Sequence, residues 1–169
     1  MRTAFLGAAI SAALITLAAC GASNNDADVA FAQRMIPHHA QAVEMAGLVD
    51  GRTTNPQVVA LAADIEKAQQ PEIDTLTGWL KSWGEPVEAG HSGHDMAGMV
   101  DTAALTGLKG ADFDRAWLTA MIEHHRGALD MANQQLGSGS DDAVKQFAAG
   151  VFAAQRAEID KMTALLTRG

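Results

Sequence analysis

A short motif that combines methionine and histidine occurs twice in the chain. It has the form Met-Ile-x-His-His, and another methionine follows ten residues after the first one. Thioether sulfur is a soft ligand that selects Cu(I), and imidazole accepts Cu(I) or Cu(II), whereas zinc prefers cysteine, histidine and carboxylate. The combination therefore indicates a copper site. Its candidate ligands are Met35, His38, His39 and Met45 in the first copy and Met121, His124, His125 and Met131 in the second.

The candidate ligands of each copy share one face of a predicted helix. At about 100° per residue, those of the first copy fall within roughly 120° of arc, which is the width of a buried face. Ala42 and Ala46 lie between them and leave space for an ion or for a neighbouring helix. Glu44, and Asp130 in the second copy, point the opposite way and are expected at the surface.

The same pattern has a structural interpretation. A row of methionines on a helix usually packs in a core, and a buried histidine is more often hydrogen-bonded than bound to a metal. Burying two adjacent imidazoles is costly unless they find partners. Because two such pairs occur, each flanked by methionines, we favour metal binding over a purely structural role.

A second group of the same side chains lies in the stretch 85–110. Of the six histidines in the chain, the two outside the motif are both here, and so are two of the eight methionines. The stretch is rich in glycine, so it is either a secondary metal site or a linker without a function of its own. The residues concerned are His91, His94, Met96 and Met99.

Two pairs of polar residues have helical spacing further along the chain. Gln69 precedes Glu72 by three positions, and Gln155 precedes Glu158 in the same way. If these side chains face the interior, they would hold imidazole N–H groups in one tautomer. A solvated or helix-pairing position is an equally supported interpretation.

An internal repeat organises the elements that must position these side chains. At a shift of 86 positions, residues 28–83 align with residues 114–169 without a gap. The match includes the histidine motif, the Gln-x-x-Glu pair and both turns. The chain therefore consists of two copies of one unit.

Each unit is predicted to be a helical hairpin. Apolar periodicity and turn residues predict helices, and no segment alternates as a strand does. Neither hairpin could bury its apolar stripe alone, so we expect an all-α four-helix bundle in which the hairpins pair as one domain. The predicted helices cover about 28–49, 55–83, 112–136 and 141–167, within hairpins 28–84 and 111–169 joined by a long linker at 85–110.

The first 19 residues have the features of a secretory signal. Arg2 supplies a positive charge, an apolar run follows, and small residues precede a cleavage point. The ending Leu-Ala-Ala-Cys resembles the lipobox of bacterial lipoproteins, which implies lipid on Cys20; an ordinary signal peptide with a chance cysteine is the alternative. We expect residues 20–27 to tether the domain to a bacterial membrane, outside the cytoplasm at the periplasmic or cell-surface face. Cys20 is the only cysteine, which excludes an internal disulfide.

The charge of the chain limits its partners. Twelve lysine and arginine residues stand against 20 aspartate and glutamate residues, a formal net charge of −8 at pH 7. Phosphate backbones are bound by basic surfaces, so nucleic acid is not an expected partner.

The two motif copies also resemble a known family. Phe-Asp-Arg-Ala-Trp-Leu at residues 113–118, followed by the second motif and Met131-Ala132, is similar to the domain-of-unknown-function family 305, and so is the first copy with Met45-Ala46. The resemblance covers essentially the whole chain after the signal. It implies a ferritin-like fold, and the family's CopM-like members bind copper in the periplasm. Carried over by motif, it implies ligand roles for the eight motif residues but not for those of the linker.

We therefore expect a copper-binding lipoprotein that buffers, sequesters or hands on copper, in the last case to a copper-transfer partner protein. A metal-free structural or interaction lipoprotein is the main alternative. A ferritin-like metalloenzyme is less favoured, because such sites need a Glu-x-x-His motif on each of two helices. The only such spacing is Glu88 to His91, in the glycine-rich linker, so no enzymatic activity is expected.

Overall fold

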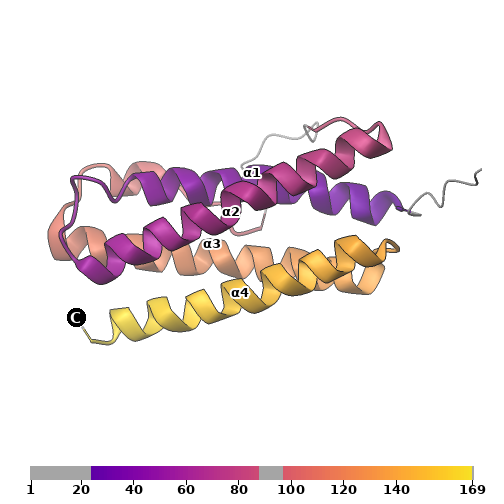
Figure 1. Ribbon diagram of the computed structural model, residues 1–169. Coiled ribbons are helices and arrows are strands. Elements are labelled where there is room, and N and C mark those ends of the chain that lie inside the picture. The colour runs from indigo at the N-terminus through magenta and orange to yellow at the C-terminus, as the bar shows by residue number, and fades with distance from the viewer. Residues whose placement is uncertain (1–23, 88–96, 169) are drawn as a thin grey trace, which may run out of the picture.

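The predicted four-helix bundle is confirmed. The computed structural model describes residues 24–87 and 97–168, and these form helices without any strand. Figure 1 shows the helices running side by side along one axis. Their ends differ from the predicted ones by a residue or two. The helices are α1 (Asp26–Gly47), α2 (Pro56–Trp83), α3 (Gly110–Ser138) and α4 (Asp142–Leu166).

The predicted linker contains structure that sequence reasoning did not anticipate. A short 3-10 helix, η2 (Thr102–Leu105), lies in it, and Leu105 is buried against α3. Among the described residues no helix has the length and apolar character needed to cross a lipid bilayer. The predicted signal and lipid site lie outside the described residues, as do three of the linker candidates. These are residues 1–19, Cys20, His91, His94 and Met96.

Helix starts are set by short polar side chains. Asn25 and Asp141 each accept hydrogen bonds from two backbone N–H groups, at the starts of α1 and α4, and Asn55 accepts one from the start of α2. Such caps satisfy N–H groups that have no partner inside the helix. Helix α3 begins instead after Lys109, where Gly110 adopts a positive φ of 56° that glycine tolerates.

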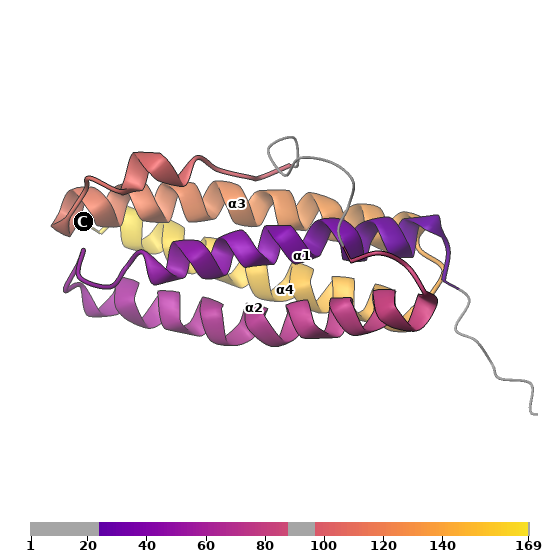
Figure 2. The ribbon, with the colours of Figure 1, turned by 90° about the horizontal axis from the view of Figure 1, so that it is seen from above.

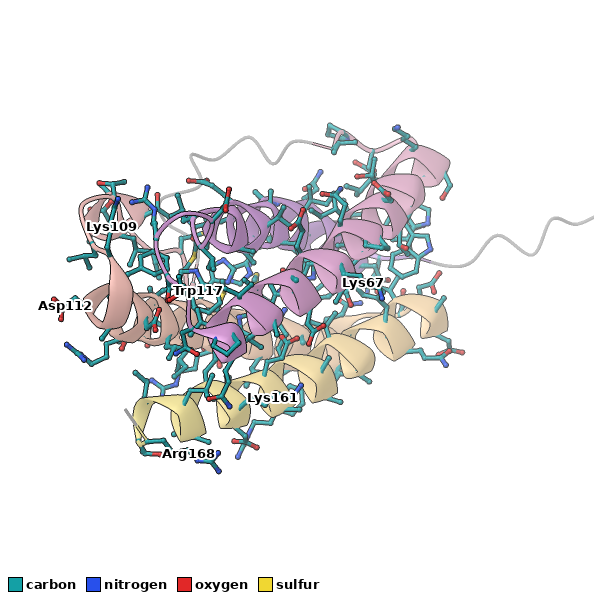
Figure 3. All side chains as sticks on the ribbon, turned by 60° about the vertical axis from the view of Figure 1, so that its left-hand side comes forward. Lys67, Lys109, Asp112, Trp117, Lys161 and Arg168 are labelled. Carbon is teal, nitrogen blue, oxygen red and sulfur yellow. The ribbon has the colours of Figure 1, made fainter. Side chains whose placement is uncertain are left out.

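Helices α1 and α3 form the central pair of the bundle. Each also packs along its own hairpin partner, α1 with α2 and α3 with α4. Figure 2 shows the four helices from above. Figure 3 places Trp117 among the helices, while Lys67 and Lys161 extend outwards. The side chains that face inwards between α1 and α3 therefore lie deepest in the protein.

A buried carboxylate at the start of α1 holds the turn between α3 and α4. Asp28 is fully buried and accepts hydrogen bonds from the backbone of Asn25, Ser140 and Asp141 and from the side chain of Gln135. Burial alone would raise the pKa of Asp28, but these bonds hold it below its ordinary value. The carboxylate therefore stays ionised and ties the first hairpin to the second.

The repeat places an equivalent contact at the other end of the bundle. Asp114, which corresponds to Asp28, accepts a hydrogen bond of 3.0 Å from the side chain of Asn55 in the turn between α1 and α2. The start of each hairpin thus meets the turn of the other hairpin. Helices α1 and α3 must therefore run antiparallel, about an approximate two-fold axis through the middle of the bundle.

Removing the Asp28 carboxylate is expected to destabilise the fold. Asp28→Ala should lower the free energy of unfolding by about 2 to 4 kcal/mol, because buried N–H groups lose their acceptor. Urea denaturation followed by circular dichroism measures the change. Asp26→Ala is the control, since exposed Asp26 lies in the same helix turn and should cost less than about 1 kcal/mol. Equal losses in the two variants would show that the cross-hairpin bonds contribute nothing.

Candidate metal centre

A polar layer divides the apolar core in two. Along each helix, residues of one apolar cluster are separated from those of the other by buried or half-buried histidine, glutamine or glutamate. On α1, for example, Met35 belongs to one cluster and Ala42 to the other. The residues between the clusters are called the polar layer here. It comprises His38, His39, Gln69, Glu72, His124, His125, Gln155 and Glu158.

Two histidines meet at the centre of the layer. The rings of His38 on α1 and His124 on α3 lie 3.7 Å apart between centroids, with 32° between their planes. Both are fully buried. The two residues correspond under the repeat, so they meet at the approximate two-fold axis. The antiparallel packing of α1 and α3 places them there.

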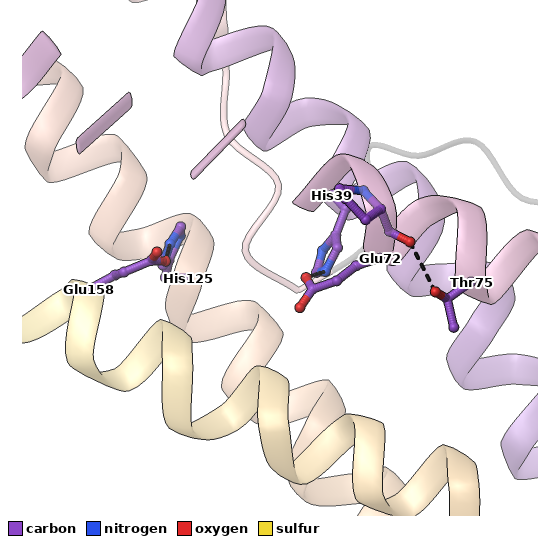
Figure 4. A network of polar contacts seen from close by, with 6 residues as sticks. His39, Glu72, Thr75, His125 and Glu158 are labelled. Carbon is purple, nitrogen blue, oxygen red and sulfur yellow. Dashed lines mark hydrogen bonds and ion pairs between the residues drawn. The ribbon is translucent and has the colours of Figure 1, made fainter. Parts of the chain in front are cut away.

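The other two histidines turn outwards to carboxylates. Nε2 of His39 lies 2.8 Å from Oε2 of Glu72, and Nε2 of His125 lies 2.8 Å from Oε2 of Glu158 (Figure 4). An ionised carboxylate can only accept, so Nε2 donates in each pair. This assigns the proton of the neutral ring to Nε2 and leaves the Nδ1 lone pair free. Of the two interpretations of the Gln-x-x-Glu pairs, the contact with histidine is therefore present for Glu72 and Glu158 but not for Gln69 and Gln155.

Many polar atoms of the layer lack hydrogen-bond partners. Both ring nitrogens of His38 and of His124, and Nδ1 of His39 and His125, are buried without one. The side-chain amides of Gln69 and Gln155 are equally unpaired and nearly fully buried. A buried polar group without a partner costs about 1 to 3 kcal/mol. Neutral imidazole nitrogens with free lone pairs are suitable donors for a soft metal ion, so the residues fit the metal that their types indicate.

The two central histidines are held in the neutral form. Burial, followed by repulsion from His125 and His39, lowers the pKa of His124 to about 3. Burial and the other three histidines lower the pKa of His38 well below its ordinary value. Each ring also approaches the backbone of the other residue, which raises the pKa, but no ring nitrogen reaches hydrogen-bonding geometry.

The four motif methionines do not meet at one point. Met45 and Met121 belong to the apolar cluster on one side of the polar layer, and Met35 and Met131 to the cluster on the other side. Ten residues of helix span about 15 Å, so two methionines of one copy cannot share an ion. Each side of the layer thus receives one methionine from each copy, which indicates two half-sites instead of one shared site.

Described residues of the linker lie across α1 and α3 beside the layer. The side chain of Gln41 makes two hydrogen bonds of 3.0 Å with the backbone of Val100. A Cβ on Gly98 would lie 2.7 Å from the carbonyl oxygen of His124, and one on Gly127 would overlap the Ala97 carbonyl. We call residues 97–100 the strap. Met99, the one linker candidate among the described residues, lies half-buried in it.

Sequence reasoning overlooked both residues that hold the strap. Gln41 and Gly127 occupy equivalent positions of the repeat, three residues after His38 and His124. A glycine inside a helix costs about 1 kcal/mol relative to alanine, so Gly127 was the one available signal that a backbone approaches closely at this point.

The geometry is not that of a preformed metal cage. Within residues 24–87 and 97–168, no three side chains among histidine, aspartate, glutamate and cysteine are placed to hold a metal ion together. The physical reason is visible in the contacts, because His38 and His124 face each other and His39 and His125 face carboxylates. Coordination through the layer would require the rings to turn and would recruit methionine sulfur.

Comparison with known proteins identifies relatives. The sequence model of the family described as "Domain of unknown function (DUF305)" matches residues 28–166. The crystal structure of a "putative secreted protein DUF305" from Streptomyces coelicolor is 35% identical, with a TM-score of 0.79 over 84% of this chain and 93% of that chain. A DUF305 fragment from Deinococcus radiodurans is 31% identical, with a TM-score of 0.80 over 86% and 99%.

A third relative has been solved with metals. CopM in its Cu(I)-bound form is 28% identical, with a TM-score of 0.74 over 83% of this chain and 96% of that chain. Structures of CopM in Cu(II)-bound and Ag-bound forms match similarly. The search of curated proteins finds no match.

The buried histidines predict acid sensitivity of the metal-free protein. The pKa values of His38 and His124 are depressed in the folded state, so below about pH 6.5 the unfolded chain binds more protons. The free energy of unfolding should therefore decrease as the pH is lowered below about 6.5, by about 1.4 kcal/mol per pH unit for each of the two histidines. Urea denaturation at intervals between pH 7 and pH 5 measures the slope. Aspartate and glutamate with ordinary pKa values contribute little in this window.

The control removes the two titrating groups. A variant with His38→Leu and His124→Leu should show a nearly flat profile over the same range. A flat profile in the unmodified protein would mean that the two rings accept protons without unfolding, contrary to their burial.

The strap predicts an unusual response to a glycine substitution. Alanine normally stabilises a helix by about 1 kcal/mol relative to glycine. Gly127→Ala should instead destabilise the protein by about 1 to 3 kcal/mol, because its Cβ would overlap the strap backbone. Gly150→Ala is the matched control, since a Cβ there meets nothing within 4 Å. Thermal melts show whether each substitution raises or lowers the stability of the protein. Hydrogen exchange at the Val100 amide should accelerate only in Gly127→Ala. Stabilisation by both substitutions would mean that the strap does not rest on α3 in solution.

Proposed function

The chain belongs to the DUF305 family, whose function is unknown, and on that premise we propose that it binds copper ions in the polar layer. We propose further that it acts outside the cytoplasm as a copper buffer, a copper store or a donor to a transfer protein. The supporting observations are the donor atoms of the layer, the methionines beside it and the likeness to CopM.

The observation that carries the proposal is the set of buried imidazole nitrogens without partners. A fold that buries four histidines at its centre leaves six ring nitrogens unpaired among the described residues. Protonation does not provide His38 and His124 with partners, because burial lowers their pKa values and keeps both rings neutral. Each neutral ring has one nitrogen with a free lone pair, so four of the six nitrogens could bind a metal ion at neutral pH without the loss of a proton. The stability lost in burying them would then be recovered when the ion binds.

Methionine indicates which metal binds. Met45 and Met121 on one side of the layer, and Met35 and Met131 on the other, are buried within the apolar clusters that adjoin the histidines. Thioether favours Cu(I) and Ag(I) over zinc, calcium or magnesium. CopM has been solved with Cu(I), Cu(II) and silver at 27–29% identity, which supports the same preference here.

The proposed roles follow from placement. The eight motif residues are the ligands, distributed over two half-sites, and each half-site includes one of the outward histidines. Glu72 and Glu158 hold the rings of His39 and His125 and compensate the charge of the ion. Gln69 and Gln155 line the layer with unpaired amides. Met99, with His91, His94 and Met96 outside the described residues, stays a proposed secondary site.

The proposed location depends on the signal sequence. The Streptomyces coelicolor relative is described as a secreted protein, which supports a place outside the cytoplasm. Lipid on Cys20 stays a prediction, because Cys20 lies outside the described residues. The proposal contains no catalytic step, in keeping with the expectation from the sequence.

A metal-free structural role is the second candidate. Two observations favour it: the outward histidines already have carboxylate partners, and the described residues contain no ready cage of histidine and carboxylate. In that case the His38–His124 stack would only join the two hairpins.

Metal titration separates the two candidates. We expect the purified protein to compete with a chromophoric chelator for Cu(I) without oxygen, and to bind Ag(I) in calorimetry. Glu72→Gln and Glu158→Gln should each weaken Cu(I) binding by about 10- to 100-fold, because they release the ring of a ligand. Glu44→Gln, at an exposed position of α1, is the matched control and should bind normally.

The outcomes are distinct. Failure of the unmodified protein to bind Cu(I) or Ag(I) would exclude the copper function and leave the structural one. Normal binding after both glutamate substitutions, with binding lost after His91, His94, Met96 and Met99 are changed to alanine, would move the site to the linker.

A further inference from the structure

The two sides of the polar layer differ at one methionine. Met162 on α4 is fully buried, and its equivalent on α2 is Leu76, also fully buried. We propose that Met162 joins Met45 and Met121 in a three-methionine site that is the tighter of the two half-sites for Cu(I). This inference rests on the proposed copper function and deepens it, because no motif of the repeat includes Met162.

The first step places Met162 beside Met121. The contact between His125 and Glu158 fixes the relative position of α3 and α4, with Nε2 and Oε2 2.8 Å apart. These helices form an antiparallel hairpin, so four residues back on α3 and four residues forward on α4 move in the same direction by one turn. Met121 and Met162 occupy those two positions. Both are fully buried in the same apolar cluster.

The second step brings Met45 to the same place from α1. The indole Nε1 of Trp117 donates a 2.8 Å hydrogen bond to the carbonyl oxygen of Met45. Trp117 lies four residues before Met121, one turn further along the same face of α3. Met45 is therefore level with this part of α3, is fully buried and belongs to the same cluster. Three methionines from three different helices thus lie in one apolar cluster, with Met45 within about one helical turn of the other two.

The same construction on the other side yields only two sulfur atoms. The contact between His39 and Glu72 fixes the position of α1 against α2, and one turn beyond it lie Met35 and Leu76. Met131 completes that group from α3 in the second cluster. The approximate symmetry of the fold therefore produces two similar groups of buried side chains, one with three thioethers and one with two thioethers and an isobutyl group.

Three thioethers suit a monovalent soft ion. They are neutral and need no deprotonation, and they discriminate against Zn(II) and against hard cations. A cation in an apolar cluster still needs nearby negative charge. Glu158, whose side chain is only 15% exposed, lies one helical turn from Met162 and supplies that charge.

Packing would accept leucine at this position as readily as methionine. Leucine fills the equivalent place at Leu76 and is fully buried there. Leucine and methionine exchange in a core at a cost below about 1.5 kcal/mol. The substitution therefore separates the contribution of sulfur from that of volume, and the repeat itself supplies the reciprocal control.

The experiment exchanges the two side chains in the full chain. Competition titration with Cu(I) and Ag(I) is performed on the unmodified protein, on Met162→Leu and on Leu76→Met. We expect Met162→Leu to weaken the tighter site by about tenfold or more, the scale on which metal sites respond to loss of one supporting group. Leu76→Met should strengthen the weaker site towards the tighter one. Urea denaturation without metal checks that both variants are folded.

A spectroscopic measurement gives a second readout on the unmodified protein. The ¹³C-labelled methyl resonances of Met45, Met121 and Met162 should shift together as the first equivalent of Ag(I) is added. Unchanged affinity in Met162→Leu, or a Met162 methyl that does not shift while the protein binds silver, would overturn the role of Met162 and leave the copper function standing. Absence of any Cu(I) or Ag(I) binding by the unmodified protein would overturn both.

Discussion

The structure depends on burying four imidazoles at the middle of a helical bundle. Each hairpin carries two adjacent histidines on its apolar face, and neither face can avoid water except against the other. Pairing the hairpins therefore forces polar nitrogen into the core. Two apolar clusters, one on each side of the polar layer, must supply the stabilisation that offsets this cost. The polar layer therefore destabilises the core, and the apolar packing on either side of it keeps the protein folded.

Contacts at the ends of the bundle determine what happens at its centre. Asp28 and Asp114 each hold the turn of the opposite hairpin, which sets the antiparallel register of α1 and α3. That register brings His38 against His124 and sends His39 and His125 to opposite sides. A shift by one helical turn would move each histidine about 5 Å into an apolar cluster. The end contacts and the polar layer are therefore parts of one arrangement.

The sequence predicted the helices and the buried face, because these follow from local periodicity, and the repeat indicated the pairing of two similar hairpins. For Glu72 and Glu158 it left a contact with histidine and a solvated position equally supported, because helical spacing alone does not show which helix face is buried. A helical wheel records direction but not position along the axis, so the wheel alone placed Met35 and Met45 together, although the rise of 1.5 Å per residue separates them by about 15 Å. It could not reveal the strap, because the bonds between Gln41 and Val100 join residues far apart in the chain.

The topology explains why the strap crosses the candidate site. Since α1 and α3 are antiparallel, α2 ends at the opposite end of the bundle from the start of α3, as Figure 2 shows. The connection must span the length of α3, about 40 Å at 1.5 Å per residue. It therefore passes the middle of the bundle, where the histidines lie, on one face only. A single connection cannot follow two-fold symmetry, so the two copies must differ where it passes. Gln41 binds the strap through its side chain, and Gly127 admits it by having none. The duplicated fold thus acquires one covered face beside the proposed metal ligands, and the covering segment contains Met99, a residue of the same type as the proposed methionine ligands.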